Sequence, residues 1–180
     1  QRVGGQVESI SWFMAEGFSA AMNAFTGQNC GAKLYDRVKR SYWVAVLVTG
    51  IWGTMTSLLL VFGAAPIFRI FIREPEVLPV GVSYLMVLGY GQMPMCLELM
   101  TVGALQGLGK TLSSSVITIL LTSARIPVAI LLSSTALGLN GIWWALTITS
   151  VAKGIVFVAY YAWTLHGLGQ GRLTVQTGSR

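Results

Sequence analysis

The sequence predicts an all-α fold, a polytopic membrane bundle of five transmembrane helices. Of its 180 residues, 54% are hydrophobic and only 10% are charged, whereas about a quarter of the residues in a soluble domain carry a charge. Five apolar runs are long enough to cross a bilayer as a helix, which takes about 20 residues. None of these runs alternates polar and apolar residues with a period of two, so a transmembrane β-barrel is excluded.

The five spans are expected at about 7–27, 42–68, 79–106, 113–134 and 141–165. The first ends in small residues, 27–33, that are typical of a chain leaving the membrane. The second is the clearest, because residues 41–68 carry no charge and begin with Tyr42 and Trp43, rings that favour the membrane interface. The third starts at Pro79, a residue that suits the first turn of a helix.

The last two spans are separated by a short turn rich in glycine. The fourth span is interrupted by Arg125 and Pro127, and the turn before the fifth contains Gly138, Asn140 and Gly141. Residues 166–180 are polar and glycine-rich, so we expect a tail outside the membrane there.

The basic residues predict which side each loop faces. If the loop 33–40 is cytoplasmic, seven of the twelve Lys and Arg residues lie inside, namely Lys33, Arg37, Lys39, Arg40, Lys110, Arg172 and Arg180. Arg2, Arg69 and Arg73 then lie outside, which agrees with the positive excess found in cytoplasmic loops. We therefore expect the N-terminus outside and the C-terminus in the cytoplasm. Because five spans starting outside, with Gln1 first, are unusual for a whole protein, we expect a piece of a longer chain.

Four ionisable residues fall near the middle of predicted spans: Glu16, Glu98, Arg125 and Lys153. Each costs roughly 2.5 to 3.5 kcal/mol at the centre of a membrane helix, so they should face the bundle interior or water. They can line a pathway for a coupling cation or a substrate, or they can pair as fixed packing elements; the sequence leaves both open. Pro94, one turn before Glu98, and Pro127 are expected to kink their helices.

Other chemistry finds little support in the residues. The sequence Gly107-Leu108-Gly109-Lys110-Thr111 resembles the end of a phosphate-binding loop, but Ala104 stands where the first glycine belongs, and a helix C-cap suits it better. The single histidine, His166, and two distant cysteines, Cys30 and Cys96, offer no transition-metal site, and free thiols are expected. The basic residues form no face for nucleic acid, and no enzyme constellation converges.

Two further patterns concern packing and binding. The spacings Gly27 to Gly31 and Gly103 to Gly107 are typical of closely packed membrane helices. Methionine and aromatic residues of the third span can form an adaptable apolar binding surface or serve packing alone: Tyr84, Met86, Tyr90, Met93, Met95 and Met100.

Three blocks of the chain together resemble the multidrug and toxic compound extrusion (MATE) transporters. The first is Gly17-Phe18-Ser19-Ala20-Ala21 followed by Gly27-Gln28-Asn29-Cys30-Gly31-Ala32-Lys33. The second runs from Leu97-Glu98-Leu99-Met100 to Gly103-Ala104-Leu105-Gln106-Gly107-Leu108-Gly109-Lys110-Thr111, and the third is Gly141-Ile142-Trp143-Trp144-Ala145. Gln106 departs from the family pattern, which often has Arg there, so no role is carried to it.

The resemblance implies a twelve-helix exporter of two six-helix lobes in the bacterial inner membrane, driven by Na⁺ or H⁺ antiport without another cofactor. This chain would supply helices eight to twelve, and its partners would be the N-terminal lobe, the first helix of this lobe, membrane lipids and small organic substrates. Glu98 lies in the helix where the family places an acid of this lobe. The alternatives are a lipid-linked oligosaccharide flippase of the same superfamily, favoured by a cationic cavity, and a non-transporting membrane scaffold subunit.

Overall fold

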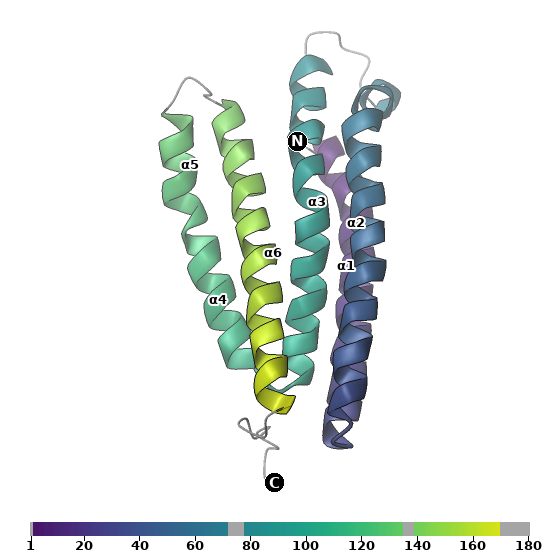
Figure 1. Ribbon diagram of the computed structural model, residues 1–180. Coiled ribbons are helices and arrows are strands. Elements are labelled where there is room, and N and C mark those ends of the chain that lie inside the picture. Colours follow the sequence, from purple (N-terminus) through teal and green to yellow (C-terminus); the bar gives the residue numbers. More distant parts are fainter. Residues whose placement is uncertain (1, 72–77, 135–138, 170–180) are drawn as a thin grey trace.

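A computed structural model describes residues 2–71, 78–134 and 139–169, and in these ranges the chain forms six α-helices and no strand (Figure 1). The helices are α1 (Arg2–Gly31), α2 (Tyr35–Phe71), α3 (Leu78–Gly107), α4 (Thr111–Ser123), α5 (Arg125–Ser133) and α6 (Leu139–Gly169). They run up and down alternately, with α4 and α5 forming one broken rod. The expectation of an all-α bundle is confirmed.

Within the described ranges, four segments are long and apolar enough to cross a membrane: Tyr35–Pro66, Gly81–Gly107, Thr111–Ser133 and Gly141–Gly167. These match four of the five predicted spans. The remaining helix, α1, has 30 residues, which is ample length for a crossing. It is more polar than the others because it contains Glu16 and several amide and hydroxyl side chains.

The helices extend beyond the predicted spans at several ends. The sequence predicts a tail from residue 166, but α6 continues to Gly169. The rest of the tail, residues 170–180, lies outside the described part of the chain. Arg73 and residues 135–138 of the last turn lie outside it as well. The turn after α1, the turn after α3 and the end of α6 lie at one end of the bundle (Figure 1). This is the end that the basic residues predict to be cytoplasmic.

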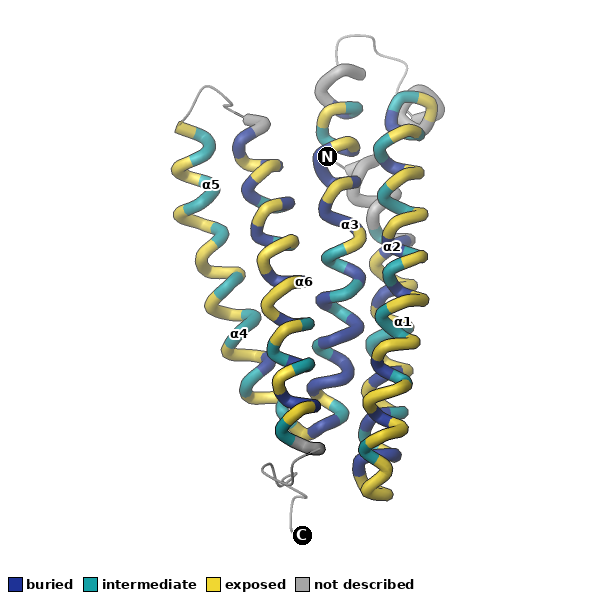
Figure 2. The backbone as a smooth tube through the Cα atoms, viewed as in Figure 1, coloured by how far each residue is buried: buried dark blue, intermediate teal, exposed yellow. Residues whose placement is uncertain are grey.

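Helix α3 occupies the middle of the bundle, where it packs against α1, α2 and α6. Figure 2 shows buried residues on most sides of its lower half, whereas α4 and α5 are largely exposed. A core cluster of buried side chains lies near the end of the bundle at which α1 and α3 end. There Tyr42 of α2 stacks on Tyr161 of α6 with ring centroids 4.0 Å apart, and its hydroxyl lies 3.1 Å from the Thr101 hydroxyl of α3.

Glycines allow α3 to approach its neighbours closely. A Cβ atom added at Gly103 would collide with the backbone of Ser19 in α1, and one at Gly107 would lie 2.5 Å from the Asn23 carbonyl oxygen. Gly103 and Gly107 therefore act as the predicted small-residue packing motif. The spacing Gly27 to Gly31 is used only in part, because Gly27 faces Gly107 at ordinary distance and Gly31 faces open space.

The end of α3 is a Schellman cap. Gly109 has φ 75°, the Gly109 N–H donates to the Gln106 carbonyl at 2.9 Å, and the Lys110 N–H donates to the Leu105 carbonyl at 3.0 Å. The predicted C-cap is thus confirmed. Helix α1 ends in the same way, but with Lys33, at φ 59°, in the position that glycine usually occupies.

The two prolines singled out from the sequence behave differently. Helix α3 continues through Pro94 without interruption, and how far it bends there stays a prediction. The fourth span is broken near Pro127, because α4 ends at Ser123 and α5 begins at Arg125. Pro127 has no N–H, so it cannot donate the helical hydrogen bond to the Ser123 carbonyl four residues earlier. Pro66 lies inside α2, a position that the sequence analysis did not single out.

Candidate functional site

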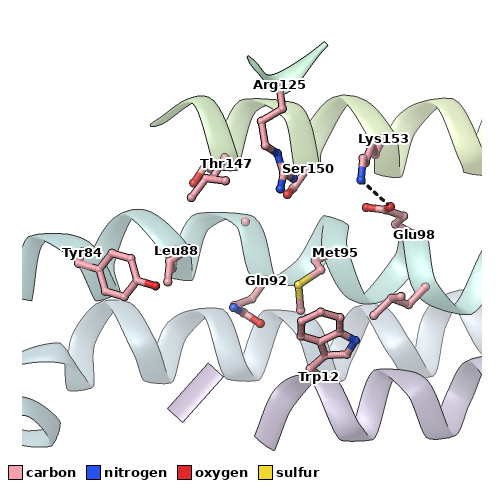
Figure 3. Close-up of a pocket in the computed structure, with 13 residues that line it drawn as sticks. Trp12, Tyr84, Leu88, Gln92, Met95, Glu98, Arg125, Thr147, Ser150 and Lys153 are labelled. Carbon is pink, nitrogen blue, oxygen red and sulfur yellow. Dashed lines mark ion pairs between the residues drawn. The ribbon is translucent and has the colours of Figure 1, made fainter. Parts of the chain in front are cut away.

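A cavity of about 340 Å³ opens between α1, α3, α5 and α6 (Figure 3), a size at the lower end of small-molecule sites. One face of α3 lines it, because its residues recur at helical spacing: Tyr84, Leu88, Gly91, Gln92, Met95, Glu98 and Leu99. One face of α6 lies opposite, with Leu146, Thr147, Ser150 and Lys153, while α1 contributes Trp12 and α5 contributes Arg125.

Glu98 and Lys153 form an ion pair across this cavity. The Lys153 Nζ lies 3.3 Å from the Glu98 Oε1, and both residues are buried. The contact joins the second half of α3 to the middle of α6, where Gly154 lets the backbone of α6 approach Pro94. Three of the four predicted mid-span charges, Glu98, Arg125 and Lys153, therefore meet at one cavity.

Arg125 is the first residue of α5, directly after the break in the fourth span. Its Nε–H donates to the Thr149 hydroxyl at 3.0 Å, and that hydroxyl itself donates to the Ala145 carbonyl at 2.7 Å. In Figure 3 the guanidinium points from α5 past α6 into the cavity, beside Ser150. Arg125 therefore brings a cationic group to the cavity from the first residue of α5.

Gln92 is an uncharged polar residue that the sequence analysis missed. Its side chain is 1% exposed, lines the cavity, and its Oε1 has no hydrogen-bond partner among the described residues. Such a buried acceptor costs about 1 to 3 kcal/mol unless water or a ligand satisfies it. The signal that could have found it is spacing, since Gln92 lies on the face of α3 that also carries Leu88, Met95 and Glu98.

The other predicted residues have mixed positions. Glu16 is exposed on α1 and does not line the cavity, so its expected place in a pathway has no structural support here and stays a prediction. Tyr84 and Met95 of the predicted apolar surface line the cavity, whereas Met100 is core and Met86, Tyr90 and Met93 are exposed. Cys30 and Cys96 are free thiols, as predicted, and the structure shows that both are buried.

No group of three or more His, Cys, Asp and Glu residues that could hold a metal ion occurs in the described part of the chain. The described lining of the cavity offers one carboxylate, one ammonium and one guanidinium beside apolar and aromatic walls. A bundle of apolar helices with ionisable groups facing an interior cavity is the arrangement of a membrane transport protein.

Known proteins are similar to this chain in sequence and in fold. The MatE family model matches residues 2–131, so the chain belongs to the MatE family of membrane transporters. The probable multidrug resistance protein NorM of Thermotoga maritima is 30% identical over 147 residues, which cover 79% of this chain and 31% of that protein. The FAD transporter of Shewanella oneidensis is 28% identical over 159 residues, covering 88% of this chain and 34% of that protein.

A solved structure has the same fold. It is described as the inward-facing conformation of a multidrug resistance MATE family transporter of the MOP superfamily, and it superimposes with a TM-score of 0.84 at 19% identity, covering 98% of this chain and 40% of that one. The match includes α1, the most polar of the helices. The chain spans about a third of the length of the curated relatives it matches.

Proposed function

We propose that the protein to which this chain belongs is a cation-coupled antiporter that exports drugs or other small organic compounds by alternating access. In this proposal Glu98 exchanges Na⁺ or H⁺, and the cavity between α1, α3, α5 and α6 forms part of the substrate pathway. Family membership supports the transport class, and one relative carries a multidrug resistance name. The observation that carries the proposal is the Glu98–Lys153 pair, an ionised pair lining a cavity in the middle of two apolar helices.

In this proposal the Lys153 ammonium and the coupling cation compete for the Glu98 carboxylate. In the present arrangement the Lys153 ammonium neutralises Glu98 at 3.3 Å. A proton on Glu98 would cancel its charge and release Lys153, while Na⁺ would have to displace the ammonium from the carboxylate. Either event changes what holds α3 against α6 at the level of Pro94, where a helix lacks one backbone hydrogen bond. Loading of the cation would thereby favour a second packing of these two helices.

The test is drug accumulation in cells that express the full-length protein, with external Na⁺ and pH varied separately. Wild type is expected to lower accumulation in response to one of the two gradients, and Glu98→Gln is expected to abolish that dependence. Glu98→Gln leaves the charge of Lys153 without its partner. The double variant Glu98→Gln with Lys153→Met removes both the acid and this unpaired charge, so it is the control for the single variant. Efflux that still follows the gradient in a folded double variant would remove Glu98 from the mechanism.

A non-transporting scaffold is the alternative from another class. It predicts that the double variant, which lacks both charges, differs from wild type in the free energy of unfolding and leaves drug accumulation unchanged. The flippase alternative is favoured by the two cations at the cavity, Arg125 and Lys153. It predicts that reconstituted protein scrambles a lipid-linked sugar between leaflets and leaves soluble drugs in place.

A further inference from the structure

The charges that line the cavity do not cancel. Glu98 and Lys153 neutralise each other at 3.3 Å, which leaves the Arg125 guanidinium as an additional cation. Among the described residues, Glu98 supplies the one carboxylate of the lining. Arg125 also lines the cavity, and its Nε–H donates to a neutral hydroxyl, that of Thr149. Among the described residues that line it, the cavity therefore has one more cationic than anionic side chain.

The described residues leave most of the hydrogen-bonding capacity of the Arg125 guanidinium unused. It offers five N–H donors in a planar fork, of which the Nε–H is used on Thr149. The Thr149 hydroxyl already gives its own hydrogen to a backbone carbonyl, so it orients the guanidinium without neutralising it. The free edge of such a fork matches carboxylate and phosphate oxygens, which it binds through two parallel hydrogen bonds.

The remaining walls define the body of a ligand. Trp12 and Tyr84 present aromatic rings, and Leu88 and Met95 present apolar side chains (Figure 3). The unpartnered Oε1 of Gln92, in a side chain 1% exposed, is an acceptor that suits an N–H or O–H group of the ligand. Arg125 comes from α5 on one side of the cavity, and Gln92 and Trp12 lie on the other.

From these features we infer that the substrates of this site are small organic anions: compounds with a carboxylate or phosphate group bound by Arg125 and an apolar or aromatic body bound between Trp12, Tyr84 and Met95. The inference rests on the proposed transport function, because it names the class of compound that occupies the same cavity. Glu98 and Lys153 remain the coupling pair and take no part in holding the anion.

The test uses full-length protein purified into phosphatidylcholine nanodiscs and three probes of nearly equal size: naphthaleneacetate, its uncharged amide naphthaleneacetamide, and the cation naphthylethylammonium. Wild type is expected to bind the carboxylate roughly ten- to a hundredfold more tightly than the amide, the range of a charged hydrogen bond. Arg125→Gln should reduce carboxylate binding to the level of the amide, and Arg125→Lys, which keeps the charge but loses the fork, should lie between. Amide binding should be the same in all three proteins.

Arg40→Gln is the matched control, since it removes the same charge from an exposed position outside the cavity. Equal binding of the three probes by wild type, a preference for the ammonium, or full carboxylate affinity in folded Arg125→Gln would overturn the inference. If Arg125→Gln does not fold, the order of the probes on wild type decides. Carboxylate binding that disappears when phosphatidylglycerol replaces phosphatidylcholine would assign the site to a lipid headgroup and also overturn it.

The transport proposal fails separately. Efflux that depends on Glu98 in a protein that binds the three probes alike would refute the anion class and leave the antiporter standing. Binding of the carboxylate through Arg125 in a protein that moves no compound would support the site and refute the antiporter.

Discussion

Glu98 and Lys153 depend on each other because both are buried and lie 3.3 Å apart. A charge left alone in such a place is costly, and breaking a buried pair from one side typically lowers stability by about 3 to 5 kcal/mol. The two partners are not equivalent here. Lys153→Met leaves Glu98 at a cavity that still has one cation, Arg125. Glu98→Gln instead leaves two cations and, among the described lining residues, no carboxylate.

We therefore expect Glu98→Gln to lower the free energy of unfolding by roughly 3 to 5 kcal/mol and Lys153→Met to lower it by less, with the double variant recovering most of the loss. The measurement is denaturant unfolding of the full-length protein in detergent micelles. Additive losses in the double variant would mean that the pair contributes no coupling energy.

Lys33 is a second residue whose position predicts an energetic effect. It has φ 59° in the cap of α1, a conformation that costs a side-chain-bearing residue roughly 1 to 2 kcal/mol relative to its usual ones. Lys33→Gly should raise the free energy of unfolding by about 0.5 to 1 kcal/mol, since glycine pays no such cost but orders a freer chain. Gly109→Ala, at the equivalent place in the cap of α3, should lower it by a similar amount. Both changes in the free energy of unfolding are measured by the same experiment. A change of the same sign for Lys33→Gly and Gly109→Ala would contradict the left-handed cap conformation at these two residues.

At the scale of elements, the glycines of α3 set the distance to α1. Gly103→Ala and Gly107→Ala each force a methyl group against the α1 backbone, at Ser19 and Asn23 respectively. Overpacking of this kind typically lowers stability by about 1 to 3 kcal/mol. The expected loss appears as a lower unfolding midpoint of the full-length protein.

Gly17→Ala and Gly50→Ala are the matched controls, because nothing lies within 4 Å of the added atom at either position. They should be neutral or stabilise by up to about 1 kcal/mol, the usual gain for alanine inside a helix. A loss at Gly17 equal to the loss at Gly103 would show that the close approach of α3 to α1 does not account for the effect of the added methyl group.

The elements themselves were accessible from the sequence to different degrees. The spans followed from length and apolarity, and the break in the fourth span followed from Pro127, because a missing backbone donor acts locally. Which residues face the cavity was harder. Helix α3 is apolar on all sides, so no polar stripe separates its cavity face from its lipid face, and Gln92 passed unnoticed in the apolar run.

The same limit applies to charges. Glu16 and Glu98 both lie near the middle of a predicted span, yet Glu98 is buried beside Lys153 and Glu16 is exposed on α1. A hydropathy pattern locates a residue along its helix, but it does not show which side of the helix the residue lies on. The meeting of Glu98, Arg125 and Lys153 depends on contacts between helices separated in the chain, which spacing within one helix cannot report.

For the whole molecule, the arrangement of the helices ties three regions to one side of the membrane. The turns after α1 and α3 and the end of α6 lie at the same end of the bundle (Figure 1), and this end carries Lys33, Arg37, Lys39, Arg40 and Lys110. Because short cytoplasmic loops hold an excess of Lys and Arg, this end should face the cytoplasm. Any single measurement of sidedness at one of these places must then agree with the others.

We expect single cysteines placed at Arg40 and Lys110 to resist a membrane-impermeant maleimide in intact cells and to react after permeabilisation. A cysteine at Arg73, which lies outside the described residues and on the predicted outer side, should react in intact cells. The background is the full-length protein with every cysteine replaced by serine, including Cys30 and Cys96, and these two thiols are buried, so their removal changes little exposed surface. Labelling of Arg40→Cys and Lys110→Cys from outside would invert the topology, and opposite results at these two positions would contradict the up-and-down arrangement of α2 and α3 itself.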